Sequence, residues 1–189
     1  MQIDQELVLR PLRKKEIALL PPGARPGDHR TRFYLQEGGM VLYLIAWLGS
    51  TAVGHLLLTW EGETREPMGS HLVRCPHLSD FNVLPEYRSH GIGTHMLEHI
   101  EQLVQEREYQ RIGLGVGVNN LRARALYARH GYQDSGLGEY MASWSWIDEQ
   151  GQEYLAIERC LYLVKALDRR EQIGYNADIL NDPEIRKDV

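Results

Sequence analysis

Residues 88–94, Arg88-Ser89-His90-Gly91-Ile92-Gly93-Thr94, connect a predicted strand to a predicted helix. The strand covers residues 77–83 and is followed by a turn that contains Pro85. The helix extends to about residue 107, and its apolar residues recur at spacings that keep one face apolar: Ile92, Met96, Leu97, Ile100, Leu103 and Val104. A helix N-terminus carries unpaired N–H groups and a partial positive charge, and glycines let the backbone approach a ligand closely. Residues 88–94 therefore predict a cradle for a pyrophosphate group.

The composition is that of a soluble globular protein, with 43% hydrophobic and 25% charged residues among 189. A net charge of -5 argues against nucleic acid as the main partner, because a phosphate backbone requires a basic surface. Two cysteines, Cys75 and Cys160, do not make a disulfide framework, and no secretory signal is recognised. We expect a cytoplasmic protein with one domain over residues 1–167 and a polar C-terminal extension over residues 168–189.

Residues 40–60 contain no Asp, Glu, Lys or Arg and are long enough to span a membrane. Gly49-Ser50-Thr51 interrupts this apolar run near its middle, and Gly54-His55 interrupts it again. Two apolar strands joined by a tight turn at Gly49 explain these breaks better than a transmembrane helix does. We therefore expect a hairpin and no membrane partner.

The remaining elements follow from turn residues and from the period of the apolar positions. Residues 7–10 form a first strand that ends at Pro11, and residues 13–20 form a short helix. Polar loops are expected over residues 25–32, where a loop could lie over a substrate site, and over residues 61–70. Later elements are the start of a strand at 72–74, a helix over 121–130, and a hairpin of strands 141–147 and 153–167 that turns at 148–152. This order predicts an α/β chain with a mixed, largely antiparallel central sheet.

The strand over residues 111–118 has one apolar face and one face made only of glycines, Gly113, Gly115 and Gly117. Such a face costs strand stability, and it lets another group lie very close to the backbone. That group is either a tightly packed helix or a ligand chain in a narrow slot. The residues alone leave both interpretations open.

Two longer stretches carry recognisable motifs. The first is Leu78-Ser79-Asp80-Phe81-Asn82-Val83-Leu84-Pro85-Glu86-Tyr87-Arg88-Ser89-His90-Gly91-Ile92-Gly93. The second is Asn120-Leu121-Arg122-Ala123-Arg124-Ala125-Leu126-Tyr127-Ala128-Arg129-His130-Gly131-Tyr132. The first resembles the fourth strand and Arg/Gln-x-x-Gly-x-Gly/Ala loop of the GNAT superfamily, the acyl-CoA-dependent N-acyltransferases. The second resembles the later Asn-x-x-Ala-x-x-Leu-Tyr motif of the same family.

The resemblance implies a GNAT-like sheet, flanked by helices, whose fourth and fifth strands splay apart around acetyl-CoA. It implies that the backbone from Arg88 to Thr94 holds the pyrophosphate and that Val83 pairs with the pantetheine arm. It favours the ligand interpretation of the glycine face, although tight packing stays possible. The cofactor-binding residues implied in this way are Phe81, Asn82, Val83, Arg88, Ser89, His90, Gly91, Ile92, Gly93, Thr94, Asn120 and Tyr127.

The catalytic candidates also come from family position. Tyr127 would lie near the cofactor sulfur as general acid, and its alternative role is that of a core tyrosine. His77 stands where some relatives carry a glutamate base, and its ordinary pKa suits proton transfer near neutral pH. Asp80 is a weaker candidate for the base, and a structural histidine with a water chain as base is the alternative to both.

The resemblance thus implies an N-acetyltransferase that transfers the acetyl group of acetyl-CoA directly to a primary amine, expected to be that of a small molecule. Two alternatives are a non-catalytic acyl-CoA-binding module and an acetyltransferase for protein N-termini or lysines. The hairpin with Trp144 and Trp146 would shape the acceptor pocket, and a homodimer is possible. His95, Glu98 and His99 match an inverted zinc-protease motif, but the lack of a third ligand argues against a metal.

Overall fold

The computed structural model describes residues 6–21, 28–63, 72, 74–147 and 152–167. A seven-stranded sheet forms its centre, with the strand order β1-β2-β3-β4-β5-β7-β6. Only β4 and β5 are parallel neighbours, and every other pair is antiparallel. The predicted mixed, largely antiparallel sheet is confirmed. The strands are β1 (Leu7–Pro11), β2 (Val41–Leu48), β3 (Thr51–Thr59), β4 (His77–Val83), β5 (Arg111–Gly117), β6 (Gln133–Ile147) and β7 (Glu153–Ala166).

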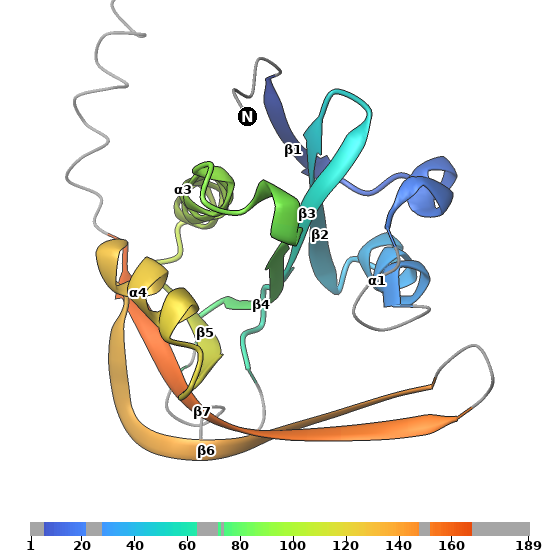
Figure 1. Ribbon diagram of the computed structural model, residues 1–189. Helices are drawn as coiled ribbons and strands as arrows, with labels where there is room; N and C mark the ends of the chain where they lie inside the picture. The colour runs from blue at the N-terminus through green and yellow to red at the C-terminus, as the bar shows by residue number, and fades with distance from the viewer. Residues whose placement is uncertain (1–5, 22–27, 64–71, 73, 148–151, 168–189) are drawn as a thin grey trace, which may run out of the picture.

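Helices cover both faces of the sheet (Figure 1). On one face lie α3 (Ile92–Glu106) and α4 (Leu121–Arg129). On the other lie the 3-10 helix η1 (Lys14–Leu19) and α1 (Asp28–Glu37), while a second 3-10 turn, η2 (Pro85–Tyr87), leads from β4 to α3. The sheet therefore has a hydrophobic core on each side.

Strand β2 explains why residues 40–60 are so apolar. Its even-numbered residues from Leu44 to Leu48 pack in the core beneath α3, and its odd-numbered residues from Tyr43 to Trp47 pack in the core beneath α1. In a strand that is buried on both faces, apolar residues do not alternate with polar ones, so the sequence is a continuous apolar run. The predicted hairpin with β3 is confirmed, and Gly49 adopts a φ of +57° at the turn. Within the described residues, none of the helices has the length and apolar character needed to cross a bilayer.

Helix α3 is held by its apolar stripe and by one buried ion pair. Met96, Leu97 and Ile100 are fully buried, and each stabilises the fold by about 1.5–3 kcal/mol relative to an exposed side chain. Gly54 on β3 lies tightly between β4 and this helix, because a Cβ there would be 2.7 Å from the backbone oxygen of Asn82 and 3.2 Å from Met96 Sδ. On the same helix, Glu101 accepts a 2.6 Å hydrogen bond from Lys165 Nζ on β7. These contacts fix the N-terminus of α3 beside the end of β4.

Strands β4 and β5 pair over only two residues, His77 with Gly113 and Leu78 with Leu114. Beyond Leu78, strand β4 continues to pair with β3 but no longer with β5. The two strands then run apart, and the gap lies in the middle of the sheet (Figure 1). This is the predicted splay of the fourth and fifth strands.

A β-bulge reshapes β4 at the point where the strands separate. His55 and Leu57 on β3 face Asn82 and Ser79, so two residues of β4, Asp80 and Phe81, oppose one residue of β3. Asp80 has a φ of +48°, a left-handed conformation that aspartate tolerates better than most residues do. Its Oδ2 accepts hydrogen bonds from Nε and Nη2 of Arg32 at 2.9 and 2.5 Å. Helix α1 therefore holds the bulge in place through Arg32.

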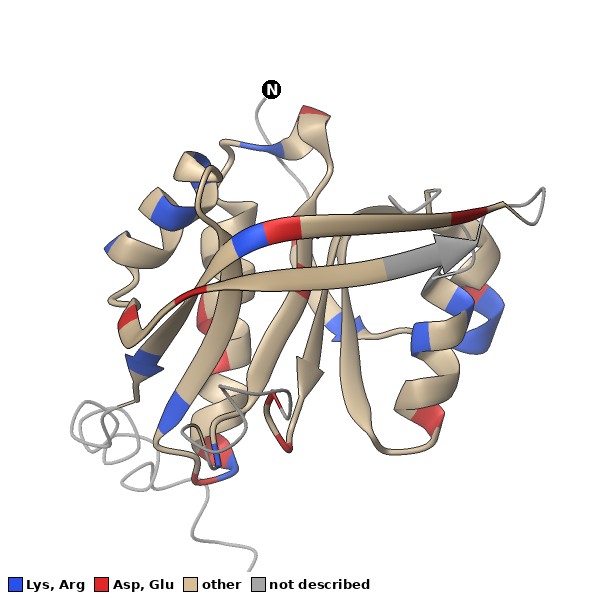
Figure 2. Cartoon of the chain, turned by 90° about the horizontal axis from the view of Figure 1, so that it is seen from below, with Lys and Arg blue, Asp and Glu red and all other residues tan. Residues whose placement is uncertain are grey.

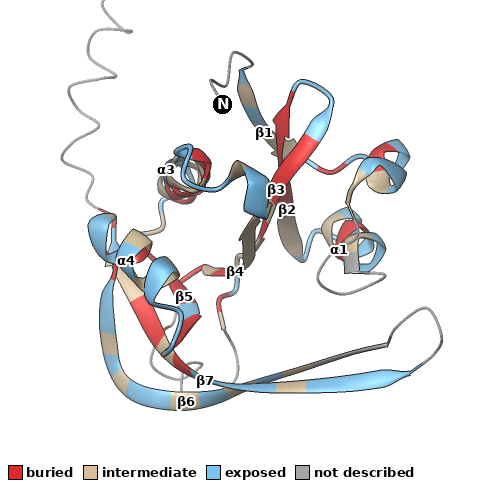
Figure 3. Cartoon of the chain, viewed as in Figure 1, coloured by how far each residue is buried: buried red, intermediate tan, exposed pale blue. Residues whose placement is uncertain are grey.

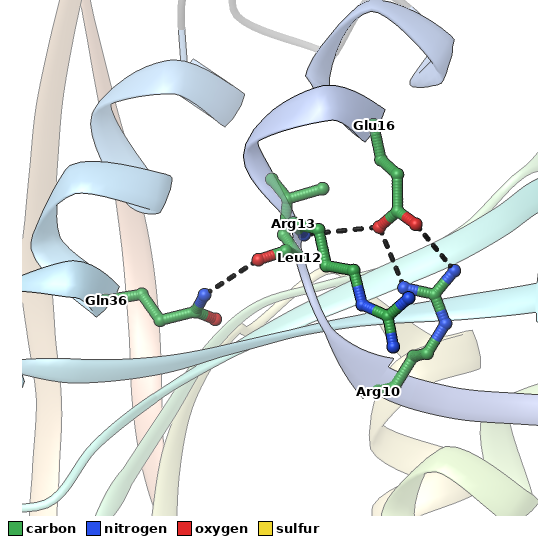
Figure 4. A network of polar contacts seen from close by, with 5 residues as sticks. All are labelled: Arg10, Leu12, Arg13, Glu16 and Gln36. Atoms are coloured by element: carbon green, nitrogen blue, oxygen red, sulfur yellow. Dashed lines mark hydrogen bonds and ion pairs between the residues drawn. The ribbon is translucent and has the colours of Figure 1, made fainter.

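A polar network anchors α1 to the edge of the sheet (Figure 4). Two guanidinium nitrogens of Arg10 bind the buried Glu16 at 2.7 and 3.0 Å, and the backbone N–H of Arg13 donates to the same carboxylate at 3.2 Å. Gln36 on α1 donates a 2.9 Å hydrogen bond to the carbonyl of Leu12. Charge-assisted bonds of this kind are about twice as strong as neutral ones. The network connects β1, η1 and α1 and so positions Arg32.

Strands β6 and β7 form a long two-stranded ribbon that curves beneath the rest of the sheet (Figure 1). Its far part is mostly exposed (Figure 3). The register shifts between Asp134 and Glu139, where Gly136 and Gly138 have φ values of +79° and +76°. These left-handed glycines permit the irregular backbone that side chains would oppose. We refer to β6 and β7 together as the ribbon.

Several sequence-based expectations need correction. The expected loop over residues 25–32 is wrong from residue 28 onward, where α1 begins. This helix has few apolar residues, so the sequence shows no helical repeat of apolar positions there. No strand starts at residues 72–74 among those described: Arg74 is a turn residue with a φ of +55° and β4 begins at His77. Strand β6 starts at Gln133 rather than at residue 141. The C-terminal extension over residues 168–189, most of the loop over 61–70 and most of the turn over 148–152 lie outside the described residues.

Replacing Glu16 by Gln should lower the free energy of unfolding by about 2 kcal/mol at pH 7, because Arg10 loses a charged partner. Hydrogen bonds from Arg10 lower the pKa of Glu16 in the folded protein. The stabilisation is therefore fully present above the unfolded-state pKa of Glu16 and is lost as pH falls through the lower folded-state pKa. Urea unfolding of the wild type and of Glu16→Gln at several pH values measures this. Glu37→Gln is the control, since Glu37 is exposed, and an equal loss there would contradict the prediction.

Candidate functional site

Two cavities meet where β4 and β5 separate. The α3–α4 cavity has a volume of about 490 Å3 and the ribbon cavity a volume of about 480 Å3. The first is lined by β4, the loop before α3 and the helix α4, and the second by Arg32 of α1, β3, β4, β5 and the ribbon. Five residues line both cavities: Phe81, Asn82, Asn120, Ala123 and Tyr127. The two cavities are therefore adjacent at the gap and share a wall made by these five residues, and we refer to the pair as the passage.

The loop before α3 has the backbone geometry of an anion-binding nest. Ser89 and Gly91 both have left-handed φ values, +67° and +82°, and Gly91 is the N-cap of α3. Alternation of this kind directs successive backbone N–H groups toward one side. A Cβ on Gly91 would meet open space, so the positive φ is what requires glycine there. The predicted pyrophosphate cradle thus lies at the mouth of the α3–α4 cavity.

The α3–α4 cavity is basic. Arg88, Arg122 and Arg129 line it, and its described lining contains no Asp or Glu. Arg122 also donates a 3.2 Å hydrogen bond to Ser89 Oγ and so connects α4 to the loop. Helix α4 carries basic and no acidic residues (Figure 2). Arg122 and Arg129 are seven residues apart, which is two helical turns, and therefore lie on the same face of α4.

The side chains predicted to bind the cofactor line the α3–α4 cavity, except those of His90 and Ile92. His90 is exposed, and Ile92 is 3% exposed because it packs into the core under α3. The Oδ1 of Asn120 caps α4 by accepting a 3.1 Å hydrogen bond from the N–H of Ala123. The carbonyl of Val83, expected to face the pantetheine arm, accepts a 2.7 Å hydrogen bond from Nε of Arg88.

Tyr127 lies in the wall shared by the two cavities and is 6% exposed. Its ring packs against Phe81 and Tyr132, with centroid distances of 6.2 and 5.7 Å. Burial raises the pKa of Tyr127 well above its usual range, so its hydroxyl stays protonated at neutral pH. Tyr127, predicted as general acid, thus lies with a protonated hydroxyl in the wall shared by the two cavities.

The ribbon cavity contains two carboxylates and one guanidinium. Asp80 is paired with Arg32, whereas Glu158 makes no ion pair with any described residue. His55 also lines this cavity, and burial followed by the nearby Arg32 lowers its pKa to about 4. A histidine with that pKa is neutral at pH 7. The charged side chains of the ribbon cavity therefore sum to -1, from Arg32, Asp80 and Glu158.

The glycine face of β5 is filled by side chains of the ribbon. The ring of Tyr162 lies against Gly113, the hydroxyl of Tyr140 against Gly115 and the carboxylate of Glu158 against Gly117. A Cβ at Gly113 would lie 2.5 Å from Cε1 of Tyr162, so these side chains require glycine beneath them. No helix packs there in the described part of the chain. Gly115 and Gly117 line the ribbon cavity, so the open end of this face does border a ligand-sized space.

His77 lies apart from the other two catalytic candidates. Its Nδ1 shares a 3.0 Å hydrogen bond with the hydroxyl of Tyr162, and the two rings stack with centroids 5.7 Å apart. It is not among the residues that line either cavity. Asp80, by contrast, faces the ribbon cavity together with Tyr127. The structure therefore brings Asp80 and Tyr127 together and leaves His77 behind the glycine face.

Sequence reasoning did not identify Arg32, His55, Arg122, Arg129 and Glu158 as cavity residues. The spacing of Arg122 and Arg129 on a predicted helix was a usable indication. No local pattern marks the other three, because they come from distant segments. Trp144 lines the ribbon cavity, while the side chain of Trp146 lies outside the description. Among the described residues, no group of His, Cys, Asp and Glu is arranged to hold a metal ion.

Solved structures with a similar fold agree with this architecture. The ribosomal-protein-S18-alanine N-acetyltransferase of Escherichia coli superposes with a TM-score of 0.59 at 16% identity, over 86% of this chain and 95% of that one. A GNAT family acetyltransferase of Elizabethkingia anophelis with acetyl-CoA bound gives 0.56 at 14% identity, over 85% and 98%. The PaiA N-acetyltransferase of Thermoplasma acidophilum in complex with coenzyme A gives 0.56 at 13% identity, over 85% and 99%.

No curated protein matches the chain in sequence. The profile described as Acetyltransferase (GNAT) family, however, matches residues 12–132, which is more than half of the chain. The matched region contains β4, the nest, α3, β5 and α4, and so the complete α3–α4 cavity. The chain belongs to the GNAT acetyltransferase family.

Proposed function

We propose that this protein transfers the acetyl group of acetyl-CoA to a primary amine of a small molecule. The observation that carries the proposal is the pair of adjacent cavities at the gap in the sheet, one basic and one acidic, with Tyr127 in the wall that they share. A phosphate-bearing cofactor fits the basic end, and a cationic amine fits the acidic end.

The residues of the α3–α4 cavity fit coenzyme A. The nest at Ser89 and Gly91 would hold the pyrophosphate, and Arg122 and Arg129 would contribute positive charge for the phosphates. Acetyl-CoA would supply an activated thioester at the shared wall. The coenzyme and the amine would enter from opposite faces of the sheet, which supports direct transfer in a ternary complex.

The cysteines do not support a covalent acyl-enzyme. Neither Cys75 nor Cys160 lines either cavity, and both are buried. Burial raises the pKa of Cys75 to about 11, so its thiol stays protonated at neutral pH. A thiol is a weak nucleophile compared with its thiolate.

Two proton transfers are needed, and the described side chains offer a group for each. Tyr127 holds a proton at its phenolic oxygen and can give it to the coenzyme A thiolate that leaves when the carbon–sulfur bond breaks. The amine must lose a proton before it attacks, since a free alkylammonium has a pKa of about 10. Of the two predicted bases, Asp80 faces the ribbon cavity, and we propose that its carboxylate accepts this proton directly or through water.

Thiol release from acetyl-CoA with a panel of small amines tests the function. We expect release with at least one amine, alongside calorimetric binding of acetyl-CoA. Binding without release for any amine or peptide would support a non-catalytic module instead. Release only with peptides or proteins would move the acceptor class to polypeptides.

Changing Arg122 or Arg129 to Gln should weaken coenzyme A binding roughly tenfold each, since hydrogen bonds to charged groups contribute about 1.5 kcal/mol or more. Binding of acetyl-pantetheine, which lacks the phosphates, should not change. Calorimetry with both ligands separates the two effects. Arg124→Gln on the same helix is the control, because Arg124 does not line the cavity. Equal losses for both ligands would exclude phosphate recognition by these arginines.

Tyr127→Phe should lower kcat on the order of a hundredfold or more and leave the Kd for acetyl-CoA within about twofold, because only the proton donor is removed. Steady-state kinetics and calorimetry on the same preparation measure both. Tyr132→Phe is the matched control, since Tyr132 is equally buried but lines neither cavity. An unchanged kcat for Tyr127→Phe would remove the hydroxyl from the mechanism.

Asp80→Asn should lower kcat/KM and abolish the acidic limb of its pH profile, because that limb reports protonation of the base. His77→Gln should retain the limb, since His77 lies outside both cavities. Because Asp80 also holds Arg32, unfolding curves for both variants verify that the fold persists. A limb that persists in Asp80→Asn and disappears in His77→Gln would reverse the assignment.

A further inference from the structure

We propose that the acceptor carries a second cationic group and that Glu158 binds it. This inference rests on the proposed function, since it concerns the same ribbon cavity. The class of acceptor is an amine whose second ammonium group is separated from the reacting amine by an aliphatic chain. Its two anchoring residues are Glu158 and Trp144, both on the ribbon.

The argument begins with the charge of the cavity. The negative charge of Asp80 is compensated by Arg32, whose Nε and Nη2 both contact Oδ2. Glu158 has no such partner among the described residues, and the neighbouring His55 is neutral at pH 7. A cavity wall with one uncompensated carboxylate favours a cationic ligand.

The carboxylate of Glu158 is also placed by the fold. It lies against Gly117, in the space that a Cβ would otherwise occupy. Glycine at this position of β5 therefore allows the carboxylate to reach the cavity wall, and any larger residue would displace it. Gly117 itself lines the ribbon cavity, so the carboxylate is next to the space where an acceptor would lie.

Trp144 supplies the apolar part of the same wall. In the β6–β7 register, Trp144 pairs with Ala156, two residues from Glu158 along β7. Residues two apart on a strand lie on the same face, so the indole and the carboxylate both face the cavity. An indole packs against methylene groups and also attracts cations through its π-face. A methylene chain that ends in an ammonium group matches both residues at once.

The reacting amine and the second cation would then occupy different places. The reacting amine belongs at the shared wall, beside Tyr127 and Asp80, and the second cation belongs at Glu158. Glu158 in this role touches the acceptor but takes no part in proton transfer. The proposal therefore predicts an effect on acceptor binding and not on the chemical step.

The experiment compares Glu158→Gln with the wild type, using a homologous series of α,ω-diaminoalkanes and the n-alkylamines of equal chain length. The wild type should prefer the best diamine over its monoamine. In Glu158→Gln, kcat/KM for the diamine should fall on the order of tenfold to a hundredfold through KM, with kcat within about twofold and with monoamines unaffected. Glu153→Gln, which removes the same charge from a position on the same strand that lines neither cavity, should behave as the wild type.

Calorimetric binding of the diamine to the protein saturated with coenzyme A is measured in parallel and does not depend on turnover. Weaker diamine binding by Glu158→Gln alone would support the anchor even if no acetyl transfer were found, in which case only the proposed function would fail. The proposed role of Glu158 would be contradicted if the wild type showed no preference for diamines or if Glu158→Gln bound the diamine as tightly as the wild type. An equal fall in kcat for diamines and monoamines would also contradict it, because Glu158 would then act as a base. Thermal unfolding of each variant shows whether the fold is intact.

Discussion

The early end of the pairing between β4 and β5 is the constraint on which the rest of the structure depends. After Leu78 and Leu114 the strands are no longer paired, so the rest of β4 runs along the gap without β5 as its neighbour. The bulge at Asp80 and its ion pair with Arg32 sustain this separation from the α1 side. The network around Glu16 in turn positions α1. A site in the middle of the sheet is thus maintained by contacts at its edge.

Charge is distributed unevenly along the passage that results. Arg88, Arg122 and Arg129 make one end basic, and Glu158 makes the other end acidic. Electrostatics alone would therefore orient two substrates of opposite charge from opposite faces of the sheet. At the junction between them Tyr127 is buried and packs against Phe81, so its hydroxyl is the proton donor of the shared wall.

The sequence predicted the part of the site that is local. The nest, α3, β5 and α4 all come from residues 78–132, where turn glycines, helix periods and the cap at Asn120 act over a few positions. The acceptor side could not be predicted in the same way, because Arg32, His55 and Glu158 meet only through the sheet order. Helix α1 escaped detection since its contacts with the sheet rest on Phe33 and on polar bonds rather than on a long apolar stripe. The glycine face was recognised, yet its occupants come from the ribbon, about 25 to 50 residues later in the chain.

The glycine face also separates two roles within the chain. Because Gly113, Gly115 and Gly117 contribute no side chains, this face of β5 is covered by Tyr162, Tyr140 and Glu158, of which Glu158 lines the ribbon cavity. If the acceptor binds in the ribbon cavity as proposed, substitutions on the ribbon change its wall while β4, the nest and α4 stay as they are. In this architecture the residues proposed to contact the acceptor can change without changing the residues proposed to contact the cofactor. Under the proposed function, exchanging the ribbon between relatives would change the acceptor and leave the cofactor site unchanged.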